Sequence, residues 1–294
     1  MSFHSGFIGF LGPPNSGKST LFNRILGRKL AIVSPRPQTT RNRIMGVLNG
    51  EDYQMVLVDT PGVHRAKNPL HRSMVDSALA SCREVDALVL VAEVIGFPVE
   101  EMGSILGVFR ELTKPAMLVL NKIDLIEPID LLPLIEKAMD LYPFESIVPL
   151  SARTGDGIEG LLEELSKRLA EGPRFFPDGI ISDQPESFIV AETIREKIYF
   201  VVGEELPYCA AVTVEGIERD GKGDLIKIRG VIHVEREGQK AIFIGKGGKT
   251  IKTIGTMARK ELERMMDTRI FLDLSVRVEK NWTRDARALR RLGY

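Results

Sequence analysis

Short apolar runs alternate with amphipathic stretches over roughly the first 170 residues of the chain. Each run is only a few residues long, which is typical of strands buried in a parallel sheet. The stretches between them repeat apolar residues at helical spacing. Strands are expected at 7–11, 53–58, 87–92, 116–120 and 147–150, and helical segments at 20–26, 105–109 and 161–169. This alternation predicts a doubly wound α/β domain with a mostly parallel sheet.

The second part of the chain has a different order of elements. The pattern predicts a helix, two strands, a short apolar segment, a second long helix and a last strand, at 187–202, 210–215, 225–234, 241–244, 249–266 and 269–278. A polar turn at 219–224 joins the first two strands as a hairpin. Prolines space out the segment before this part, which indicates a stiff linker. We therefore expect domains at 1–172 and 187–294, joined by a linker at 173–186.

Length and composition agree with two domains. The chain has 294 residues, and 44% of them are hydrophobic, which is enough for a core in each domain. The sequence holds no apolar run of about 18 residues that could span a membrane. Its first residues lead directly into the first expected strand, which leaves no room for a secretory signal. With only two cysteines, far apart in sequence, a reduced cytoplasmic protein is expected.

The net charge of zero hides an asymmetry between the two parts. Residues 195–294 hold 21 lysines and arginines against 15 acidic residues. Within 236–260, seven basic residues accompany a single acid, Glu237. Such a cluster can be an ordinary solvated helix face. Because it surrounds a glycine-rich loop, however, a polyanionic partner is the better interpretation.

The candidate chemistry begins directly after the first expected strand. Residues 12–19 read GPPNSGKS, the pattern G-x-x-x-x-G-K-[ST], and a helical segment follows. In that setting backbone N–H groups and the helix N-terminus surround phosphate oxygens. Lys18 would reach the terminal phosphates, and the hydroxyl of Ser19 would bind Mg²⁺. An ordinary glycine turn is the weaker alternative, because lysine and serine directly follow the second glycine.

Two further segments can complete a magnesium site. The loop at 34–41 contains two prolines and is expected to be exposed, and either Thr39 or Thr40 in it could add a hydroxyl when a terminal phosphate is present. The strand at 53–58 ends in Asp59-Thr60-Pro61-Gly62, the pattern D-x-x-G. Asp59 can reach the magnesium through water, and Gly62 can offer its N–H to the terminal phosphate.

Two strand ends later in the chain can select the base. Residues 121–124 read NKID, in which the carboxylate of Asp124 could accept hydrogen bonds from N1–H and the 2-amino group of guanine. Asn121 and Lys122 would brace that loop. The strand at 147–150 ends in Ser151-Ala152, whose backbone N–H could meet the guanine carbonyl. Adenine offers neither partner, so GTP is the expected nucleotide.

The complete set of candidates follows from these motifs. Lys18, Thr40 and Gly62 are the expected catalytic residues, and Ser19, Thr40 and Asp59 the magnesium ligands. The expected GTP-binding residues are Gly12, Pro13, Pro14, Asn15, Ser16, Gly17, Lys18, Ser19, Thr20, Asp59, Thr60, Pro61, Gly62, Asn121, Lys122, Asp124, Ser151 and Ala152.

A second glycine loop, GKGG at 245–248, follows the apolar segment of the second domain. The order of elements there is that of a KH module of the second topological type, whose G-x-x-G loop contacts the backbone of single-stranded nucleic acid. Apolar side chains at 244, 251 and 254 could pack on bases. A second phosphate loop is disfavoured, because no Lys-Ser follows at the required distance. The expected RNA-binding residues are Ile244, Gly245, Lys246, Gly247, Gly248, Lys249 and Lys252.

Together these motifs resemble the Era family of bacterial GTPases over nearly the whole chain. GPPNSGKST, PQTTR, DTPG, NKID and SAR carry the first half, and REK, ELPY, VEREGQK, IGKGG and ALRRLGY the second. One departure is Ser16, where the family usually has valine. Its side chain is expected to point away from the phosphates.

The resemblance implies a GTP-hydrolysing switch that acts in assembly of the small (30S) ribosomal subunit and binds near the 3′ end of 16S ribosomal RNA. It also implies a monomer that can associate peripherally with the inner membrane, and it favours Thr40 over Thr39 as the magnesium-sensing residue. Asn15 resembles a loop asparagine that holds K⁺ in related GTPases. Val63 takes the place of a water-orienting glutamine, which predicts slow hydrolysis.

Two alternatives stay open at this point. One is a GTP-independent RNA-binding scaffold, against which the intact nucleotide motifs argue. The other is another RNA-processing or RNA-modification GTPase. That class would not carry a KH module.

Overall fold

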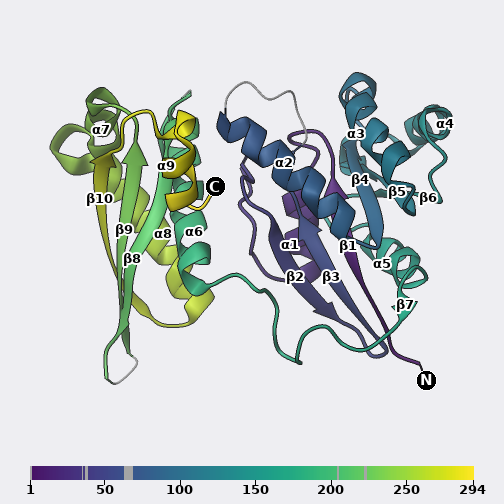
Figure 1. Ribbon diagram of the computed structural model, residues 1–294, viewed down its shortest axis with the longest axis horizontal. Coiled ribbons are helices and arrows are strands. Elements are labelled where there is room, and N and C mark those ends of the chain that lie inside the picture. The colour runs from purple at the N-terminus through teal and green to yellow at the C-terminus, as the bar shows by residue number, and fades with distance from the viewer. Residues whose placement is uncertain (1, 35, 37–38, 63–68, 204, 222–223) are drawn as a thin grey trace. The chain divides into compact units, whose positions relative to one another are not determined.

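The computed structural model describes residues 2–34, 36, 39–62, 69–203, 205–221 and 224–294, and it divides into two compact units (Figure 1). The first unit comprises the described residues up to Asp183 apart from Pro69 and Leu70, and residues 184–294 form the main part of the second. Each unit has a sheet and a core of its own. Among the described residues, no helix has both the length and the apolar character that a membrane crossing requires.

The first unit is built on a seven-stranded sheet in the order β2-β3-β1-β4-β5-β6, with β7 paired to β1. Its strands are β1 (His4–Leu11), β2 (Ile44–Asn49), β3 (Tyr53–Asp59), β4 (Ala87–Glu93), β5 (Ala116–Asn121), β6 (Ser146–Leu150) and β7 (Ala170–Glu171). All neighbours are parallel except β2 and β7, which pair antiparallel with β3 and β1. The predicted mostly parallel α/β sheet is therefore confirmed.

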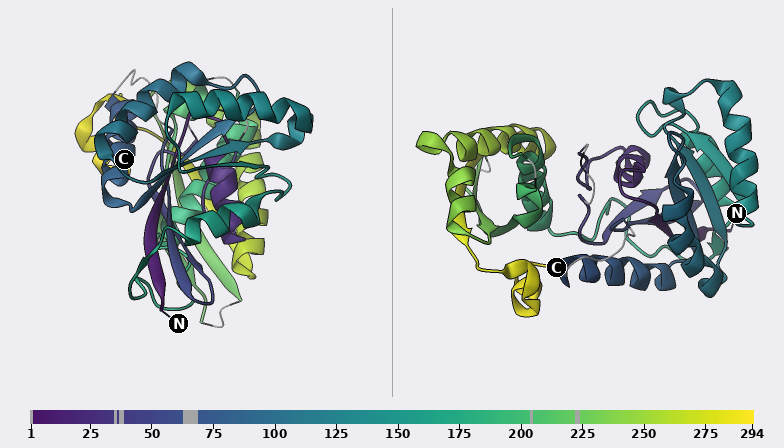
Figure 2. Two further views of the ribbon diagram at one scale, coloured as in Figure 1. Left: turned by 90° about the vertical axis from the view of Figure 1, so that its right-hand side faces the viewer. Right: turned by 90° about the horizontal axis from the view of Figure 1, so that it is seen from above.

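Helices cover both faces of this sheet. They are α1 (Lys18–Leu26), α2 (Pro69–Glu84), α3 (Val99–Leu112), α4 (Leu131–Leu141) and α5 (Ile158–Ser166). Side chains of α2, α3 and α4 share one core with the sheet, including Cys82, Phe109 and Ala138. Helix α1 lies on the opposite face from α2 (Figure 2). The motifs expected at strand ends are thus held by a sheet that is buried on both sides.

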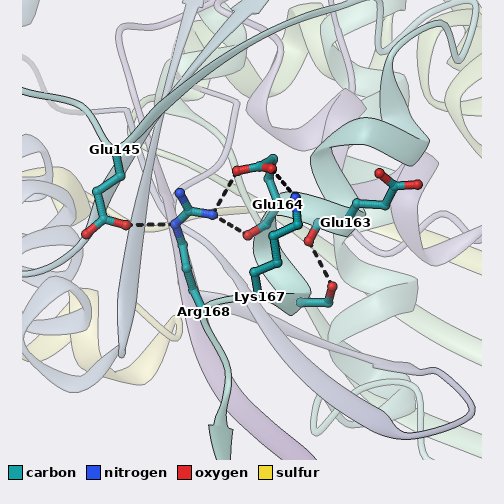
Figure 3. A network of polar contacts seen from close by, with 6 residues as sticks. Glu145, Glu163, Glu164, Lys167 and Arg168 are labelled. Atoms are coloured by element: carbon teal, nitrogen blue, oxygen red, sulfur yellow. Dashed lines mark hydrogen bonds and ion pairs between the residues drawn. The ribbon is translucent and has the colours of Figure 1, made fainter.

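An ion-pair network holds the end of α5 (Figure 3). The guanidinium of Arg168 lies 2.8 Å from Glu145 and 3.0 Å from Glu164, and Lys167 lies 2.6 Å from Glu164. Glu145 directly precedes β6, so the network ties α5 to the strand that leads to Ser151. Solvent reaches all four side chains, most of all Lys167 and Glu145, and weakens these ion pairs by screening.

The segment expected to be a stiff linker lies against the first unit. The side chain of Gln54 on β3 is fully buried, and its Oε1 accepts the N–H groups of Phe175 and Phe176 at 2.8 and 3.0 Å. Its Nε2 donates to the carbonyl of Phe176 at 2.9 Å. Further along, Val47 N–H donates to the Ile181 carbonyl at 2.7 Å. Up to Asp183 the segment therefore belongs to the first unit.

The second unit packs helices on a three-stranded sheet in the order β10-β9-β8. Its elements are α6 (Glu186–Val201), β8 (Ala211–Arg219), β9 (Leu225–Val234), α7 (Glu237–Ile244), α8 (Lys249–Met266), β10 (Arg269–Val278) and α9 (Ala286–Arg291). Strand β9 pairs antiparallel with β8 and parallel with β10. The α-β-β-α-α-β order expected from the sequence is confirmed, and α9 is an addition.

The C-terminal segment is anchored by an aromatic residue. Trp282 is fully buried, donates its Nε1–H to the carbonyl of Cys209 at 3.0 Å, and stacks on Tyr294 with ring centroids 5.6 Å apart. Asp285 caps α9 by accepting the backbone N–H groups of Arg287 and Ala288. These contacts explain how a helix of only six residues is held in place.

Candidate functional site

The phosphate loop connects β1 to α1, and Lys18 is its buried charge. The ammonium of Lys18 donates to the carbonyls of Gly12 and Pro13 at 3.0 and 2.9 Å, and the residue is 6% exposed. Burial lowers the pKa of Lys18 to about 8, although Asp59 opposes the shift. Gly17, with φ of 95°, precedes the helix, and a Cβ there would lie 2.1 Å from Asn121. The loop thus requires glycine at this position.

Three side chains from separate segments meet beside this loop. Ser19 Oγ donates to Asp59 Oδ2 at 2.7 Å and lies 2.8 Å from Thr40 Oγ1, which is 3.4 Å from the same carboxylate oxygen. Asp59 is fully buried, and its Oδ1 has no hydrogen-bond partner among the described residues. Burial raises the pKa of Asp59 to about 6, while Lys18 opposes the shift.

Such a cluster fits a hard divalent cation. A buried carboxylate with an unpaired oxygen and two adjacent hydroxyls offers the oxygen ligands that Mg²⁺ prefers. Thr40 rather than Thr39 makes the contacts to Ser19 and Asp59, so the geometry favours Thr40 as the magnesium-sensing residue. The same contacts correct one expectation, because Thr40 and Arg41 are only 5% and 3% exposed although the loop was expected to be exposed.

A cavity of about 350 Å³ opens over the loop and this cluster. Its lining combines the phosphate loop, the segment around Thr40, Gly62 of the D-x-x-G motif and Lys122 of the NKID motif. From the expected site it includes Pro14, Asn15, Gly17, Lys18, Ser19, Thr20, Thr40, Gly62 and Lys122. Asn15 has φ of 63°, a left-handed conformation that asparagine tolerates. The cavity is therefore formed by four separate parts of the sequence.

Asn121 joins the phosphate loop to the candidate base-binding loops. Its Nδ2 donates to the carbonyl of Ser16 at 2.8 Å, and its Oδ1 accepts the N–H groups of Lys122 and Ala152 at 2.8 and 3.0 Å. The bracing role expected of Asn121 is thus visible as three hydrogen bonds. The Ala152 N–H that was expected to meet the guanine carbonyl donates to Asn121 in this structure.

The carboxylate of Asp124 is held by the following loop. Its Oδ1 accepts the hydroxyl of Ser151 at 2.6 Å, and its Oδ2 forms an ion pair with Arg153 at 2.6 Å. Lys122 pairs with Glu93 at the end of β4. Both carboxylate oxygens of Asp124 therefore contact donors of the loop that follows β6.

A second hollow lies in the other unit, between α8 and the edge strand β10. It has a volume of about 390 Å³ and is lined by Ile251, Lys252, Gly255, Thr256, Arg259, Ile270, Phe271, Leu272 and Leu274. Phe271 is 59% exposed. The G-x-x-G loop stands at the N-terminus of α8, and Gly245, with φ of 74°, could not carry a side chain because a Cβ would lie 2.2 Å from Thr250 Oγ1. An apolar floor with a basic end suits single-stranded nucleic acid.

Comparisons with known proteins give both units a family. The family "50S ribosome-binding GTPase" matches residues 7–122, and the KH domain family matches residues 205–283. GTPase Era of Geotalea uraniireducens is 49% identical over 99% of this chain and 98% of its own length. The corresponding protein of Syntrophus aciditrophicus is 50% identical over 99% of this chain and 95% of its own length.

The chain belongs to the Era family of GTPases.

Solved structures of Era proteins have the same fold. A variant of the Aquifex aeolicus Era, solved with GDP and AlF4⁻, has a TM-score of 0.96 and 36% identity, with 99% of each chain covered. An Era in complex with MgGDPNP and nucleotides 1506–1542 of 16S ribosomal RNA gives the same values. Membership in this family makes the chain a GTPase with a KH domain, as the motifs predicted.

Several expected residues make other contacts in this chain. Thr60 donates its hydroxyl to the carbonyl of Phe10 at 2.8 Å and so binds β1 rather than facing the cavity. Ser16 is 1% exposed, does not line the cavity, and its Oγ has no hydrogen-bond partner among the described residues. Val63 lies outside the described residues, so slow hydrolysis stays a prediction.

One expectation for the KH unit is wrong. Ile254 is fully buried in the core and cannot pack on bases, whereas Ile244 and Ile251 are half-buried. The reason is helical geometry, because Ile254, Ala258 and Leu262 form the row of α8 that faces the sheet. Among the expected basic residues, Lys246, Lys249 and Lys252 are exposed, and Lys252 lines the hollow.

Sequence reasoning missed Arg24, Arg153 and Phe271. Phe271 stands in a strand of alternating polar and apolar residues, and only the pairing of β10 shows which side is open. Arg153 directly follows Ser-Ala, so the motif itself contained it. Arg24 gave no local signal, because its partners are more than a hundred residues away in sequence.

Proposed function

We propose that this GTPase is a molecular switch that binds 16S ribosomal RNA near its 3′ end through the KH unit and acts in assembly of the small ribosomal subunit. One observation carries the switch assignment. The hydroxyls of Ser19 and Thr40, which line the cavity together with Lys18, converge on the buried carboxylate of Asp59. Because Thr40 comes from a separate loop, its position there can depend on a terminal phosphate.

Different residues at this site would bind different parts of GTP and its Mg²⁺. Lys18 would exchange its two loop carbonyls for the terminal phosphate oxygens. Ser19, Thr40 and, through water, Asp59 would hold Mg²⁺, which supplies charge neutralisation at the phosphates. Gly62 would donate its N–H to the terminal phosphate. Asp124 would accept the N1–H and 2-amino donors of guanine, which selects GTP over ATP.

We propose further that K⁺ binds beside the phosphates with Asn15 among its ligands. Asn15 lines the cavity and carries an amide oxygen suited to an alkali cation. GTP hydrolysis is then expected to be faster in potassium chloride than in sodium chloride at equal ionic strength. Equal rates in the two salts would contradict the proposal, and Asn15→Ala is expected to remove the difference.

RNA would bind along the hollow between α8 and β10. The exposed lysines of the G-x-x-G loop would contact the phosphates of the RNA, and Phe271 offers a ring on which a base can stack. The related Era that binds nucleotides 1506–1542 of 16S ribosomal RNA supports RNA of this sequence as the ligand.

The test measures binding of a 16S 3′-end oligonucleotide in the presence of GTP or GDP. The double variant Lys246→Asp, Gly247→Asp is expected to lose at least tenfold in affinity, because two phosphate-facing positions become acidic. The matched control, Lys137→Asp, changes an exposed lysine of α4 in the first unit and should retain binding. Unchanged affinity in the double variant would contradict the RNA-binding role of this loop. Preferential crosslinking to messenger or transfer RNA would contradict the ribosomal role.

We also propose that the chain is a cytoplasmic monomer able to associate peripherally with the inner membrane. Such association would use surface contacts, since the described helices include no membrane-spanning segment. Light scattering should give a single species near the chain mass of 32.7 kDa. Flotation with vesicles of inner-membrane lipid composition tests the association, which is contradicted if the protein stays in the unbound fraction.

A further inference from the structure

Arg24 connects the helix of the phosphate loop to the candidate base-binding loop. It lies in the last turn of α1, six residues after Lys18. Its Nε donates to the carbonyl of Ala152 at 3.1 Å, and its Nη2 donates to the carbonyl of Arg153. One planar guanidinium thus holds two successive carbonyls, which is the kind of bidentate contact that lysine cannot reproduce.

These contacts fix Ala152 from the side opposite Asn121. The N–H of Ala152 is bound by Asn121, and its carbonyl is bound by Arg24. Both peptide groups that flank Ala152 are therefore held, one from the NKID motif and one from α1. Ala152 itself is 2% exposed. The backbone at this residue cannot turn without breaking one of the two contacts.

The main support of the neighbouring Asp124 does not involve Arg24. Its Oδ1 accepts the hydroxyl of Ser151, whose own N–H donates to the carbonyl of Asp156 at 2.9 Å. Its other partner, the side chain of Arg153, is 74% exposed and contributes little to holding the carboxylate. Removing Arg24 would therefore loosen Ala152 and leave the Ser151 support of Asp124 in place. This separation makes the two parts of base recognition experimentally distinguishable.

We propose that Arg24 is a positioning residue for recognition of the purine 6-position. The inference rests on the proposed GTP site, in which the Ala152 N–H, besides its hydrogen bond to Asn121, faces the 6-carbonyl of guanine and excludes a 6-amino group. Arg24 keeps that N–H close enough to donate to the carbonyl and to exclude the amino group. It acts only through Ala152 and touches no reacting atom.

The test compares dissociation constants for three nucleoside diphosphates. GDP is the reference. Inosine diphosphate lacks only the 2-amino group and so reports on Asp124. The diphosphate of 2,6-diaminopurine riboside keeps the 2-amino group and carries an amino group at position 6, so it reports on Ala152. Each variant is described by its two ratios to GDP, and a uniform loss of affinity leaves both ratios unchanged.

Arg24→Met is expected to reduce discrimination against the 6-amino nucleotide about tenfold and to leave the inosine ratio within twofold of the unmodified protein. Tenfold corresponds to about 1.4 kcal/mol, the lower range for hydrogen bonds from a charged donor. Arg24→Lys keeps one donor group, so its discrimination against the 6-amino nucleotide should lie between that of Arg24→Met and that of the unmodified protein. Arg28→Met removes an exposed arginine just beyond the same helix end and serves as the matched control, with both ratios unchanged.

The outcomes separate this inference from the proposed function. If the unmodified protein fails to discriminate either analogue from GDP, the proposed guanine site itself is wrong. If it discriminates and Arg24→Met keeps the 6-position ratio, only the role of Arg24 is wrong. A parallel loss in both ratios would also overturn the proposal, because it would mean that Arg24 supports the loop in general. Circular dichroism of each variant confirms that the ratios are measured on folded protein.

Discussion

Replacing Asp59 with asparagine is expected to stabilise the protein in the absence of nucleotide and Mg²⁺ while abolishing magnesium-dependent GTP hydrolysis. The reason is the cost of a buried charge. Burial raises the pKa of Asp59 from 3.8 to about 6. The folded state therefore binds the carboxyl proton of Asp59 more tightly than the unfolded chain does. The contribution of Asp59 to the free energy of unfolding consequently falls as the pH rises from about 4 to about 6.

The magnitude follows from the shift. About two pKa units correspond to roughly 3 kcal/mol of unfolding free energy that is lost once Asp59 is ionised. This cost is already net of the attraction between Asp59 and Lys18, which opposes the shift. Asparagine avoids the cost, so a gain of about 3 kcal/mol is expected at pH 7.5, or roughly 6–12 °C in Tm for a unit of this size.

Thermal unfolding followed by circular dichroism in EDTA provides the assay. Circular dichroism is preferred to fluorescence because the single tryptophan, Trp282, lies in the second unit. Asp59→Asn should melt above the unmodified protein at pH 7.5 and with nearly the same Tm near pH 4. Adding Mg²⁺ and GDP should reverse the order, because only the unmodified protein gains from the bound ion.

Asp140→Asn is the matched control, because it removes an exposed carboxylate on α4. It should shift Tm by less than about 2 °C at either pH. The reasoning is refuted if Asp59→Asn melts below the unmodified protein at pH 7.5 without ligands. A difference in Tm that does not change with pH would refute it equally, because the gain would then have another origin.

Three further predictions concern other parts of the molecule. Ser16→Ala should raise the unfolding free energy by about 1 kcal/mol, because it removes a buried hydroxyl that has no partner among the described residues. Thermal unfolding measures this gain, and a loss of stability would contradict the prediction. The affinity for GDP should not change. Gln54→Leu should lower the unfolding free energy by about 3 kcal/mol, since it leaves buried N–H groups of the 173–183 segment unpaired. Trypsin should then cut the variant faster after Arg174. An unchanged cleavage rate would argue against the role of Gln54 in holding this segment. Phe271→Ala should weaken RNA binding about tenfold through loss of stacking, with little change in Tm because the ring is 59% exposed, and equal affinity would rule out stacking there.

The sequence predicted the parts of the fold that depend on local pattern. Apolar runs marked the parallel strands, and the motifs at their ends marked the cavity, because ligands of open α/β sheets bind at the carboxyl ends of strands. Helix α4 and strand β2 were not predicted. Strand β2 joins the sheet as an antiparallel edge, and a short segment such as Ile44–Asn49 carries no clear period.

The remaining site features depend on contacts between distant segments. The burial of Thr40 follows from its contact with Ser19 and Asp59, which no pattern within the 34–41 loop reveals. The contacts of Arg24 arise in the same way. The burial of Ile254 is different, because its spacing to Ala258 and Leu262 was readable in the sequence. The i, i+4, i+8 spacing of these three residues indicates a core position for Ile254 and not a role in RNA binding.

The edge strand β2 connects the candidate metal site to the chain that leads into the KH unit. Its first residue, Ile44, pairs with Asp59 and follows Thr40 by four positions. Further along the same strand, Met45 accepts the hydroxyl of Ser182 at 2.6 Å, and Val47 donates to the carbonyl of Ile181. Helix α6 begins only four residues after Ser182, at Glu186.

This arrangement gives the proposed switch a physical route. Coupling between sites requires an element whose arrangement both sites influence. Strand β2 pairs along its whole length with β3, which ends at Asp59, and its other edge is hydrogen-bonded to residues 181 and 182. Residues 173–183 belong to the first unit, so the chain left to connect the two units is far shorter than a 14-residue linker at 173–186. A displacement of β2 that accompanied a change at Thr40 would therefore reach the chain within a few residues of α6 and would not be absorbed by a long flexible linker.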